Sequence, residues 1–143
     1  MIEVLVALVL LSVGLLGLAG LQATAMRVGL GSVQRSQAAQ LAQDIIERMR
    51  ANAANAGAYS LALGDAPPSC AGVAACDLRD WRLRLQALPA GTGAVTVNGS
   101  QAVVIVQWDD SRGAGALRGT LADETARAQL RATQLRITAQ LAN

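Results

Sequence analysis

The chain opens with a long apolar run that begins beside a single charge. Residues 4–26 carry no charged side chain, and Glu3 is the only charge among the first 26 residues. As an α-helix this run would be about 34 Å long, which exceeds the roughly 30 Å hydrocarbon core of a bilayer. No basic residue precedes the run, which disfavours a cleaved secretory signal ending near Ala25. The run therefore predicts a transmembrane helix over residues 1–26 with an acid at its entrance.

The helical pattern continues beyond the apolar run. Gly29 and Gly31 weaken a helix and predict a soft joint. Asp44 and Arg48 form an acid-before-base pair four residues apart, which suits an exposed face. Small and apolar residues at helical spacing form one stripe, made of Ala38, Leu41, Ala42, Ile45 and Met49. We therefore expect residues 27–52 to be an amphipathic continuation of the same helix.

Residues 53–76 are small, punctuated by Gly and Pro, and loop-like. Asp77 then has the character of a helix N-cap, and Pro89 ends the segment that follows it. Within this segment residues 81–85 also alternate between large apolar residues and Arg, so a strand is the competing interpretation. We favour the helix, because it also accounts for the apolar residues at both ends of the segment.

The strongest β signals come next. Residues 94–97 and 101–108 flank Asn98-Gly99, a typical hairpin turn, and the β-prone second run should be a central strand. Residues 133–141 alternate strictly between apolar and polar side chains, as in a strand with one wet face.

Together these elements predict an α+β fold, in which a long N-terminal helix packs its second half on a small antiparallel sheet. We expect Trp81 and Trp108 to lie in the core of a globular region formed by residues 53–143. Residues 116–132 fit either a further strand or a short helix.

Composition excludes several functions. Histidine is absent, which removes Ser-His and Cys-His nucleophile systems and His metal ligands. The 12 basic residues, all Arg, are scattered among ten acids, so no basic stripe predicts nucleic-acid binding. Asp109 and Asp110 lack the spacing of a calcium loop. We therefore predict a protein without enzymatic activity, cofactor or metal.

The chain has two cysteines, Cys70 and Cys76. Two Cys without His make a poor zinc site, and their spacing differs from the Cys-x-x-Cys of redox enzymes. If the globular region lies outside the cytoplasm, a structural disulfide is the natural state of the pair.

The first 22 residues, MIEVLVALVLLSVGLLGLAGLQ, resemble the N-terminus of type IV pilins and pseudopilins. Within that class the chain is most similar to the PilV minor pilins, the type IV pilus modification proteins. The further likeness lies in SQAAQLAQDIIERMRANAANAGAY, in the cysteine pair, in the stretch from Asp77 to Gly91 and in the strand end from Val104 to Asp109. The resemblance thus covers about residues 2–109 and implies a pilin-like fold.

The resemblance implies a role for Glu3. In the family a Glu lies four residues after the processed, N-methylated first residue. If Glu3 is that Glu, the mature N-terminus would lie two residues before Met1, after a leader removed by a prepilin peptidase. A buried carboxylate accepts few partners, and pairing Glu3 with a neighbour's terminal ammonium would set the offset between subunits. The alternative is an acid that merely gains about 0.3–1 kcal/mol at the helix N-terminus. Residues that would pack in the membrane or filament core are Leu5, Leu8, Val9, Gly14, Gly17 and Gly20.

The family function is structural. The resemblance implies a minor pilin that takes part in priming or tip assembly, held in the inner membrane with a periplasmic C-terminal domain until it enters the filament. Implied partners are other minor pilins, the major pilin, the prepilin peptidase, the inner-membrane assembly platform and the lipid bilayer. The alternatives are a type II secretion pseudopilin and a single-pass periplasmic binding module that never enters a filament.

Overall fold

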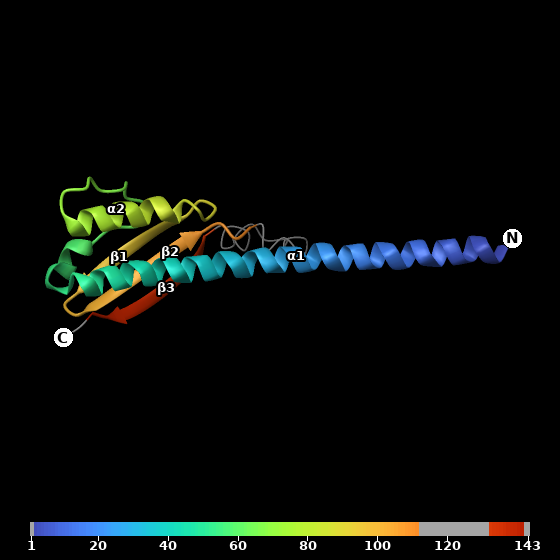
Figure 1. The fold of residues 1–143 in the computed structure, drawn as a ribbon, viewed down its shortest axis with the longest axis horizontal. Coiled ribbons are helices and arrows are strands. Elements are labelled where there is room, and N and C mark those ends of the chain that lie inside the picture. Colours follow the sequence, from blue (N-terminus) through green and yellow to red (C-terminus); the bar gives the residue numbers. More distant parts are fainter. Residues whose placement is uncertain (1, 112–131, 142–143) are drawn as a thin grey trace.

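One helix dominates the computed structural model, which describes residues 2–111 and 132–141 (Figure 1). This helix, α1, runs from Ile2 to Ala51 without a break in its helical backbone. It passes through Gly29 and Gly31, where the sequence predicts a soft joint, as regular helix. Two glycines cost only about 1 kcal/mol each relative to Ala, and the flanking turns hold the helical geometry.

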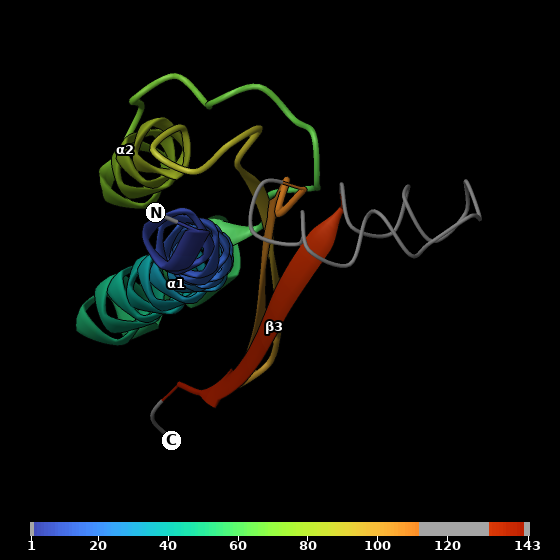
Figure 2. The ribbon, with the colours of Figure 1, turned by 90° about the vertical axis from the view of Figure 1, so that its right-hand side faces the viewer.

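The second half of α1 is the spine of the globular region. Its buried stripe follows the predicted one except at Leu41, which is only partly buried, and it adds Ile46. The residues at most 1% exposed are Ala38, Ala42, Ile45, Ile46 and Met49. Figure 2 shows α1 and a second helix on the same face of a sheet, so the fold has two layers. The predicted α+β architecture is confirmed.

The sheet is antiparallel, with strand order β1-β2-β3. Its strands are β1 (Thr92–Asn98), β2 (Gln101–Trp108) and β3 (Thr133–Gln140). The hairpin is confirmed, and so is the central place of β2. The alternating strand near the C-terminus is confirmed as β3, whose outer face is exposed.

The hairpin turn lies one residue later than the sequence predicts. Asn98 pairs with Gln101, so the two turn residues are Gly99 and Ser100 rather than Asn98 and Gly99. Gly99 has φ 58°, and Ser100 has no positive φ. A glycine with positive φ at the first central position is the requirement of a type II′ turn, which matches the twist of the two strands.

The region between α1 and β1 is more regular than predicted. Residues 53–76 are expected to be loop, but Ala53–Tyr59 forms a 3₁₀ helix, η1, and α2 begins at Val73 and ends at Leu85. The preference for a helix over a strand is confirmed, whereas Asp77 as its N-cap is wrong, because Gly72 occupies that position. Small residues such as Ala74 allow the helix to start earlier, since they pack closely and have high helix propensity.

Both tryptophans are in the core, as predicted: Trp81 is 0% and Trp108 is 1% exposed. Trp81 lies over β1 at Gly93, where a Cβ atom would be 2.5 Å from its ring and 2.8 Å from the carbonyl oxygen of Ile105. Its indole N–H donates to the carbonyl of Leu41, 2.9 Å away. Trp81 thus joins α2, α1 and the sheet. Of the ambiguous segment 116–132, all but the last residue lies outside the described residues.

Candidate assembly site

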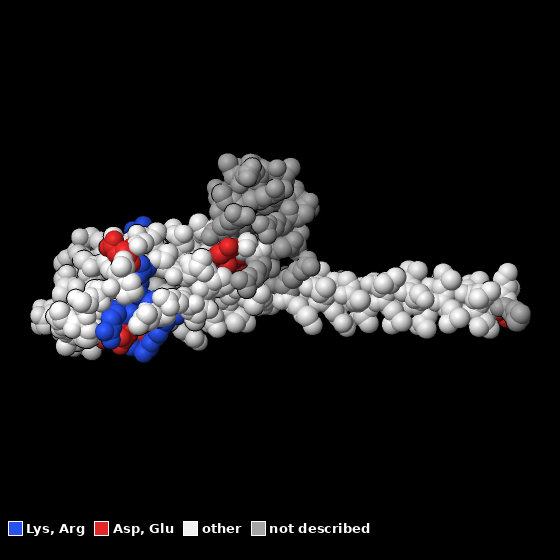
Figure 3. Space-filling view, turned by 90° about the horizontal axis from the view of Figure 1, so that it is seen from above, with Lys and Arg blue, Asp and Glu red and all other residues white. Residues whose placement is uncertain are grey.

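The first half of α1, from Ile2 to Met26, projects from the globular region, and we call it the rod. Every side chain from Ile2 to Met26 is exposed, and none contacts the core. Figure 3 shows an almost uncoloured shaft with charge only near its tip. The most apolar 18 residues of α1 have a mean hydropathy of 2.7, and α1 is the helix, within the described residues, long and apolar enough to cross a membrane. A helix that is apolar all round needs lipid or other apolar surface around it.

The predicted packing residues lie along this rod. Leu5, Leu8 and Val9 are all more than half exposed. At about 100° per residue, their spacing places these three on one face. A Cβ atom added at Gly14, Gly17 or Gly20 would meet no atom within 4 Å.

The glycines do not form a single face. Steps of three residues rotate a position by about 60° on an ideal helix, so Gly14, Gly17 and Gly20 wind around the rod. Close approach at these glycines would therefore involve more than one neighbouring helix.

Glu3 lies in the first turn of α1, at the free end of the rod. It is exposed, and within the described residues it makes no ion pair. The globular region begins tens of residues further along the helix, so it offers Glu3 no partner. Any partner for this carboxylate has to come from outside the chain or from its own helix end.

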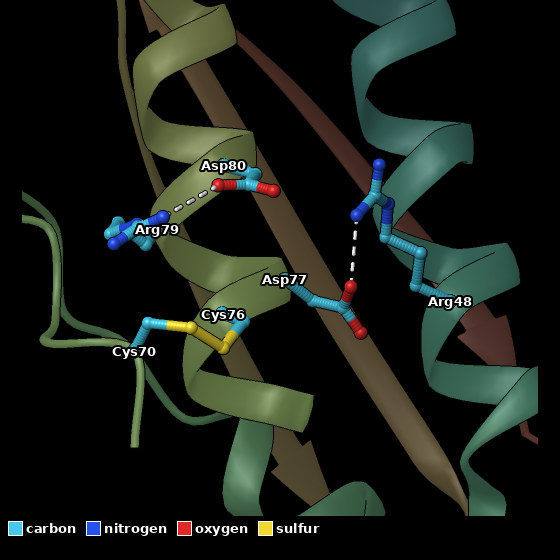
Figure 4. Close-up of a disulfide and its surroundings, with 6 residues drawn as sticks. All are labelled: Arg48, Cys70, Cys76, Asp77, Arg79 and Asp80. Atoms are coloured by element: carbon cyan, nitrogen blue, oxygen red, sulfur yellow. Dashed lines mark hydrogen bonds and ion pairs between the residues drawn. A yellow bond between two sulfur atoms is a disulfide. The ribbon is translucent and has the colours of Figure 1, made fainter. Parts of the chain in front are cut away.

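A cluster of charged side chains, which we call the polar brace, joins α1 to α2. It consists of Asp44, Arg48, Tyr59, Asp77 and Arg84. The Arg48 guanidinium lies 3.1 Å from a carboxylate oxygen of Asp44. It also lies 2.9 Å from a carboxylate oxygen of Asp77, and Figure 4 shows this second contact. The Tyr59 hydroxyl donates to the other oxygen of Asp77 at 2.6 Å, and Arg84 lies 3.2 Å from Asp44. The brace fixes the angle between the two helices.

The brace shifts the pKa of two members. Burial raises the pKa of Tyr59 above 10.0, and its hydrogen bond to Asp77 adds to this rise. Burial alone would lower the pKa of Arg48, but the hydrogen bond and charges of Asp77 and Asp44 outweigh it and raise that pKa. Both shifts favour the protonated forms, which are the forms that donate hydrogen bonds in the brace.

A second arginine is buried on the opposite side of α2. Arg82 is 9% exposed and donates to the carbonyl of Gly93 at 3.1 Å. It also donates to Thr92 and to the backbone carbonyl of Asp65. Burial lowers the pKa of Arg82, and the charge of Asp65 opposes that change. Arg82 therefore holds the loop before α2 against the start of β1.

The predicted disulfide is confirmed: Cys70 is bonded to Cys76 (Figure 4). Cys76 lies in the first turns of α2, next to Asp77 of the brace, and Cys70 lies in the preceding loop. The bond ties a Gly- and Ala-rich loop to the helix that carries the brace. A disulfide of this kind restricts the unfolded chain and is stable in an oxidising compartment.

The sequence argument missed the polar brace. It placed Arg48 on an exposed face because Asp44 lies four residues before it, but Asp77, 29 residues later, is the closer partner. The available signal was Tyr59 at the end of a stretch of small residues, since a lone Tyr among small residues is a candidate for burial. Among the described residues no group of three or more His, Cys, Asp or Glu forms a metal-ligand cluster.

A long helix, half exposed and half packed on a small antiparallel sheet, is a pilin-like layout. The comparison with protein families agrees with this layout: residues 20–80, somewhat less than half of the chain, match the Tt1218-like model, described as type IV pilin Tt1218. That match runs from the end of the apolar run through η1 and the cysteine loop into α2. The match does not distinguish PilV from other pilins. Searches of curated proteins and of solved structures found no match.

Proposed function

We propose that the chain is a minor pilin of the type IV pilus, of the PilV kind, which takes part in priming or tip assembly of the filament. The observation that carries the proposal is the division of α1. Its apolar first half is exposed throughout and continuous with a second half that carries the globular region.

The division suggests two successive environments for the rod. In the inner membrane, lipid covers the apolar side chains of residues 4–26 without cost, and residues 53–143 lie in the periplasm. Leaving the membrane would expose that surface to water, at about 25 cal/mol per Å². Assembly is favourable only where the helices of neighbouring subunits replace the lipid. The packing set Leu5, Leu8, Val9, Gly14, Gly17 and Gly20 would make those contacts.

Glu3 would select the axial position in this packing. Within an apolar helix bundle an unpaired carboxylate is costly, and the cost disappears only where a cation is in reach. The terminal ammonium of a neighbouring subunit is such a cation. One carboxylate and one ammonium per subunit allow one offset, so the pair would set the register between subunits without any contact in the globular region.

The proposal includes processing and partners. The prepilin peptidase would remove a leader and the new terminal residue would be N-methylated, as the family resemblance implies. Other minor pilins, the major pilin and the inner-membrane assembly platform would then bind the processed subunit. The cysteine pair and the stretch from Trp81 to Pro89 support a pilus subunit over a type II secretion pseudopilin.

Replacing Glu3 by Gln tests the proposal. We expect the Glu3→Gln chain to accumulate in the inner membrane at the wild-type level but to be strongly reduced in sheared filaments, as measured by quantitative mass spectrometry of both fractions. Glu47→Gln is the matched control, because Glu47 is an exposed acid on the same helix whose partner is Arg50. Equal recovery of both variants in filaments would contradict the role of Glu3, and wild-type chain found only in membranes would contradict the filament function.

A further inference from the structure

The two edge strands of the sheet, β1 and β3, differ in the backbone pairing of their outer edges. The edge at β1 is bridged at its centre, because Leu61 and Val95 exchange two backbone hydrogen bonds of 2.9 Å. At the other edge, β3 pairs with β2 on one side, and within residues 2–111 and 132–141 no strand pairs with its other side. Figure 2 shows β3 at the margin of the sheet. Strand edges left open in this way are templates for a further strand.

The hydrogen-bond pattern identifies which backbone groups of β3 are open. Because Val95 bonds away from β2, its neighbours in β1 bond toward β2, and Val104 therefore bonds toward β3. Val104 is paired with Ile137, so the odd-numbered residues of β3 bond inward. The N–H of Leu141, which donates to the carbonyl of Ser100 at 2.7 Å, continues this odd series. The N–H and C=O groups of residues 134, 136, 138 and 140 therefore face the open edge.

An incompletely covered apolar row lies beside this edge. We call Leu135, Ile137 and Ala139 the apolar ledge. Their cross-strand partners on β2, Val106, Val104 and Ala102, are 0% exposed, whereas all three ledge residues are only partly buried. The helix layer thus covers the centre of the sheet fully and its β3 margin partly. A further strand would complete the cover of the ledge with every second side chain.

Within the described residues, the open edge has little of the usual protection against pairing. The eight pairs between β2 and β3 follow one another without a bulge, and β3 contains no Pro. Its one charge is Arg136, which is exposed on the outer face of the sheet. Arg136 forms no ion pair with any described residue. On that face the neighbouring Gln134 is held by Gln107 and leaves the guanidinium available.

We infer that the open edge of β3 binds an extended segment of a partner protein, with apolar side chains over the apolar ledge and a carboxylate beside Arg136. The chemistry of the edge selects the occupant. A strand satisfies the row of backbone donors and acceptors, and its alternate apolar side chains cover the apolar ledge. An acidic side chain of that strand pairs with Arg136.

A second copy fits less well. Antiparallel pairing of two β3 strands about a two-fold axis normal to the sheet would bring Arg136 near its own copy. It would also reverse the direction of α1, which lies across one face of the sheet (Figure 2). The two anchors would then point in opposite directions and could not enter one membrane. This last step rests on the membrane anchoring of the proposed function, whereas the open edge does not.

Amide exchange tests the inference on the full chain in detergent micelles, where filament assembly plays no part. The probe is an end-capped eight-residue peptide that alternates Val and Thr and carries one central Glu; its twin carries Lys. Without peptide we expect fast exchange at residues 134, 136 and 138 and slow exchange at 135, 137 and 139. A saturating amount of the Glu peptide should slow the even-numbered amides about tenfold or more and leave the odd-numbered ones unchanged.

Two variants make the test specific. Arg136→Glu should weaken the Glu peptide about fivefold and favour the Lys peptide to a similar extent. Thr138→Pro removes one outward donor, which an edge strand tolerates, and should abolish binding while the odd-numbered amides stay slow. Those slow amides are the control for folding in both variants.

Three results would overturn the inference. Slow even-numbered amides in the chain alone at every concentration would mean that the edge is already covered. Protection that grows with chain concentration would identify a second copy as the occupant. Unchanged peptide affinity in Arg136→Glu and Thr138→Pro would place the binding elsewhere. Each result leaves the test on Glu3 unaffected, so the two proposals fail separately.

Discussion

The two halves of α1 are one continuous helix with opposite relations to the rest of the chain. From Ile2 to Met26 no side chain is buried, whereas the stripe from Ala38 to Met49 is buried completely. The first half is the more apolar of the two, so apolar content does not decide which half is covered by the fold. Pattern decides it: only the second half has a polar side, and a helix with one apolar side packs on a sheet.

The halves also differ in how charge is handled. The second half contributes Asp44 and Arg48 to the polar brace, where Arg48 is shared by Asp44 and Asp77. The first half has one carboxylate and nothing in the described chain to pair with it. The buried face of the second half therefore finds its partners within the fold, while the rod depends on its surroundings.

The largest expected difference between the halves concerns buried volume. Ile45→Ala leaves a cavity under the sheet and should lower the free energy of unfolding by about 2–5 kcal/mol. Leu16→Ala removes a similar side chain from the rod and should leave that free energy unchanged. Tryptophan fluorescence in micelles measures it, because both tryptophans lie in the globular core. Equal losses in the two variants would contradict the division of α1.

Glycine substitution sharpens the comparison at a smaller scale. A Cβ at Gly93 meets the Trp81 ring and the carbonyl of Ile105, so Gly93→Ala should destabilise the globular region by about 1–3 kcal/mol. Gly17→Ala meets nothing and should not alter this stability. Denaturant midpoints of the two variants provide the comparison. A tolerated Gly93→Ala would mean that Trp81 does not pack on β1 as described.

The polar brace provides a test based on charge. Asp77→Asn removes the carboxylate that serves Arg48 and Tyr59. We expect a loss of about 1–2 kcal/mol, because the side chains of Arg48 and Asp77 are each only about a fifth exposed. Glu47→Gln breaks the more exposed pair with Arg50 and should cost less than about 0.5 kcal/mol. Thermal unfolding in micelles measures both. Similar effects would show that the brace adds no more than a surface ion pair.

The smallest expected effect is a loss of folding stability at alkaline pH. The pKa of Tyr59 is raised by burial and by its bond to Asp77, so the folded chain holds the phenolic proton more tightly than the unfolded chain. The resulting stability is complete below about pH 10 and is lost as the pH rises through the folded pKa. Tyr59→Phe should lose about 1 kcal/mol at pH 8 but lack this additional alkaline loss. Parallel slopes for both chains between pH 9 and 11.5 would contradict the buried position of the hydroxyl.

Local pattern was sufficient to predict most of the fold. The apolar stripe of α1, the hairpin and the alternation in β3 each depend on residues close in sequence, and each is confirmed. The errors lie where distant residues decide. Asp77 has the local character of an N-cap, but Arg48 and Tyr59 hold it inside α2. The turn at Gly99 moved by one residue because the pairing register, rather than the Asn-Gly dipeptide, sets its position.

The candidate assembly site was more predictable than the brace. The apolar run can be recognised in the sequence because it is contiguous, and Glu3 stands at its start. The disulfide followed from two cysteines without histidine and is present. The open edge of β3 could not be predicted, since it depends on strand order and on Leu61 bridging the opposite edge. Intermolecular roles of Glu3 and the packing residues stay predictions, because they concern neighbouring subunits.

The central claim, that neighbouring subunits cover the rod in a filament, is tested most directly by thiol labelling. The two native cysteines are bonded to each other, so Leu16→Cys and Gln86→Cys each introduce a distinct free thiol, one on the rod and one on the exposed side of the globular region. In detergent-extracted chain a small maleimide should label both. In purified filaments, which contain no bilayer, we predict labelling at residue 86 and protection at residue 16. Labelling at residue 16 in filaments, or absence of the chain from filaments, would contradict the account.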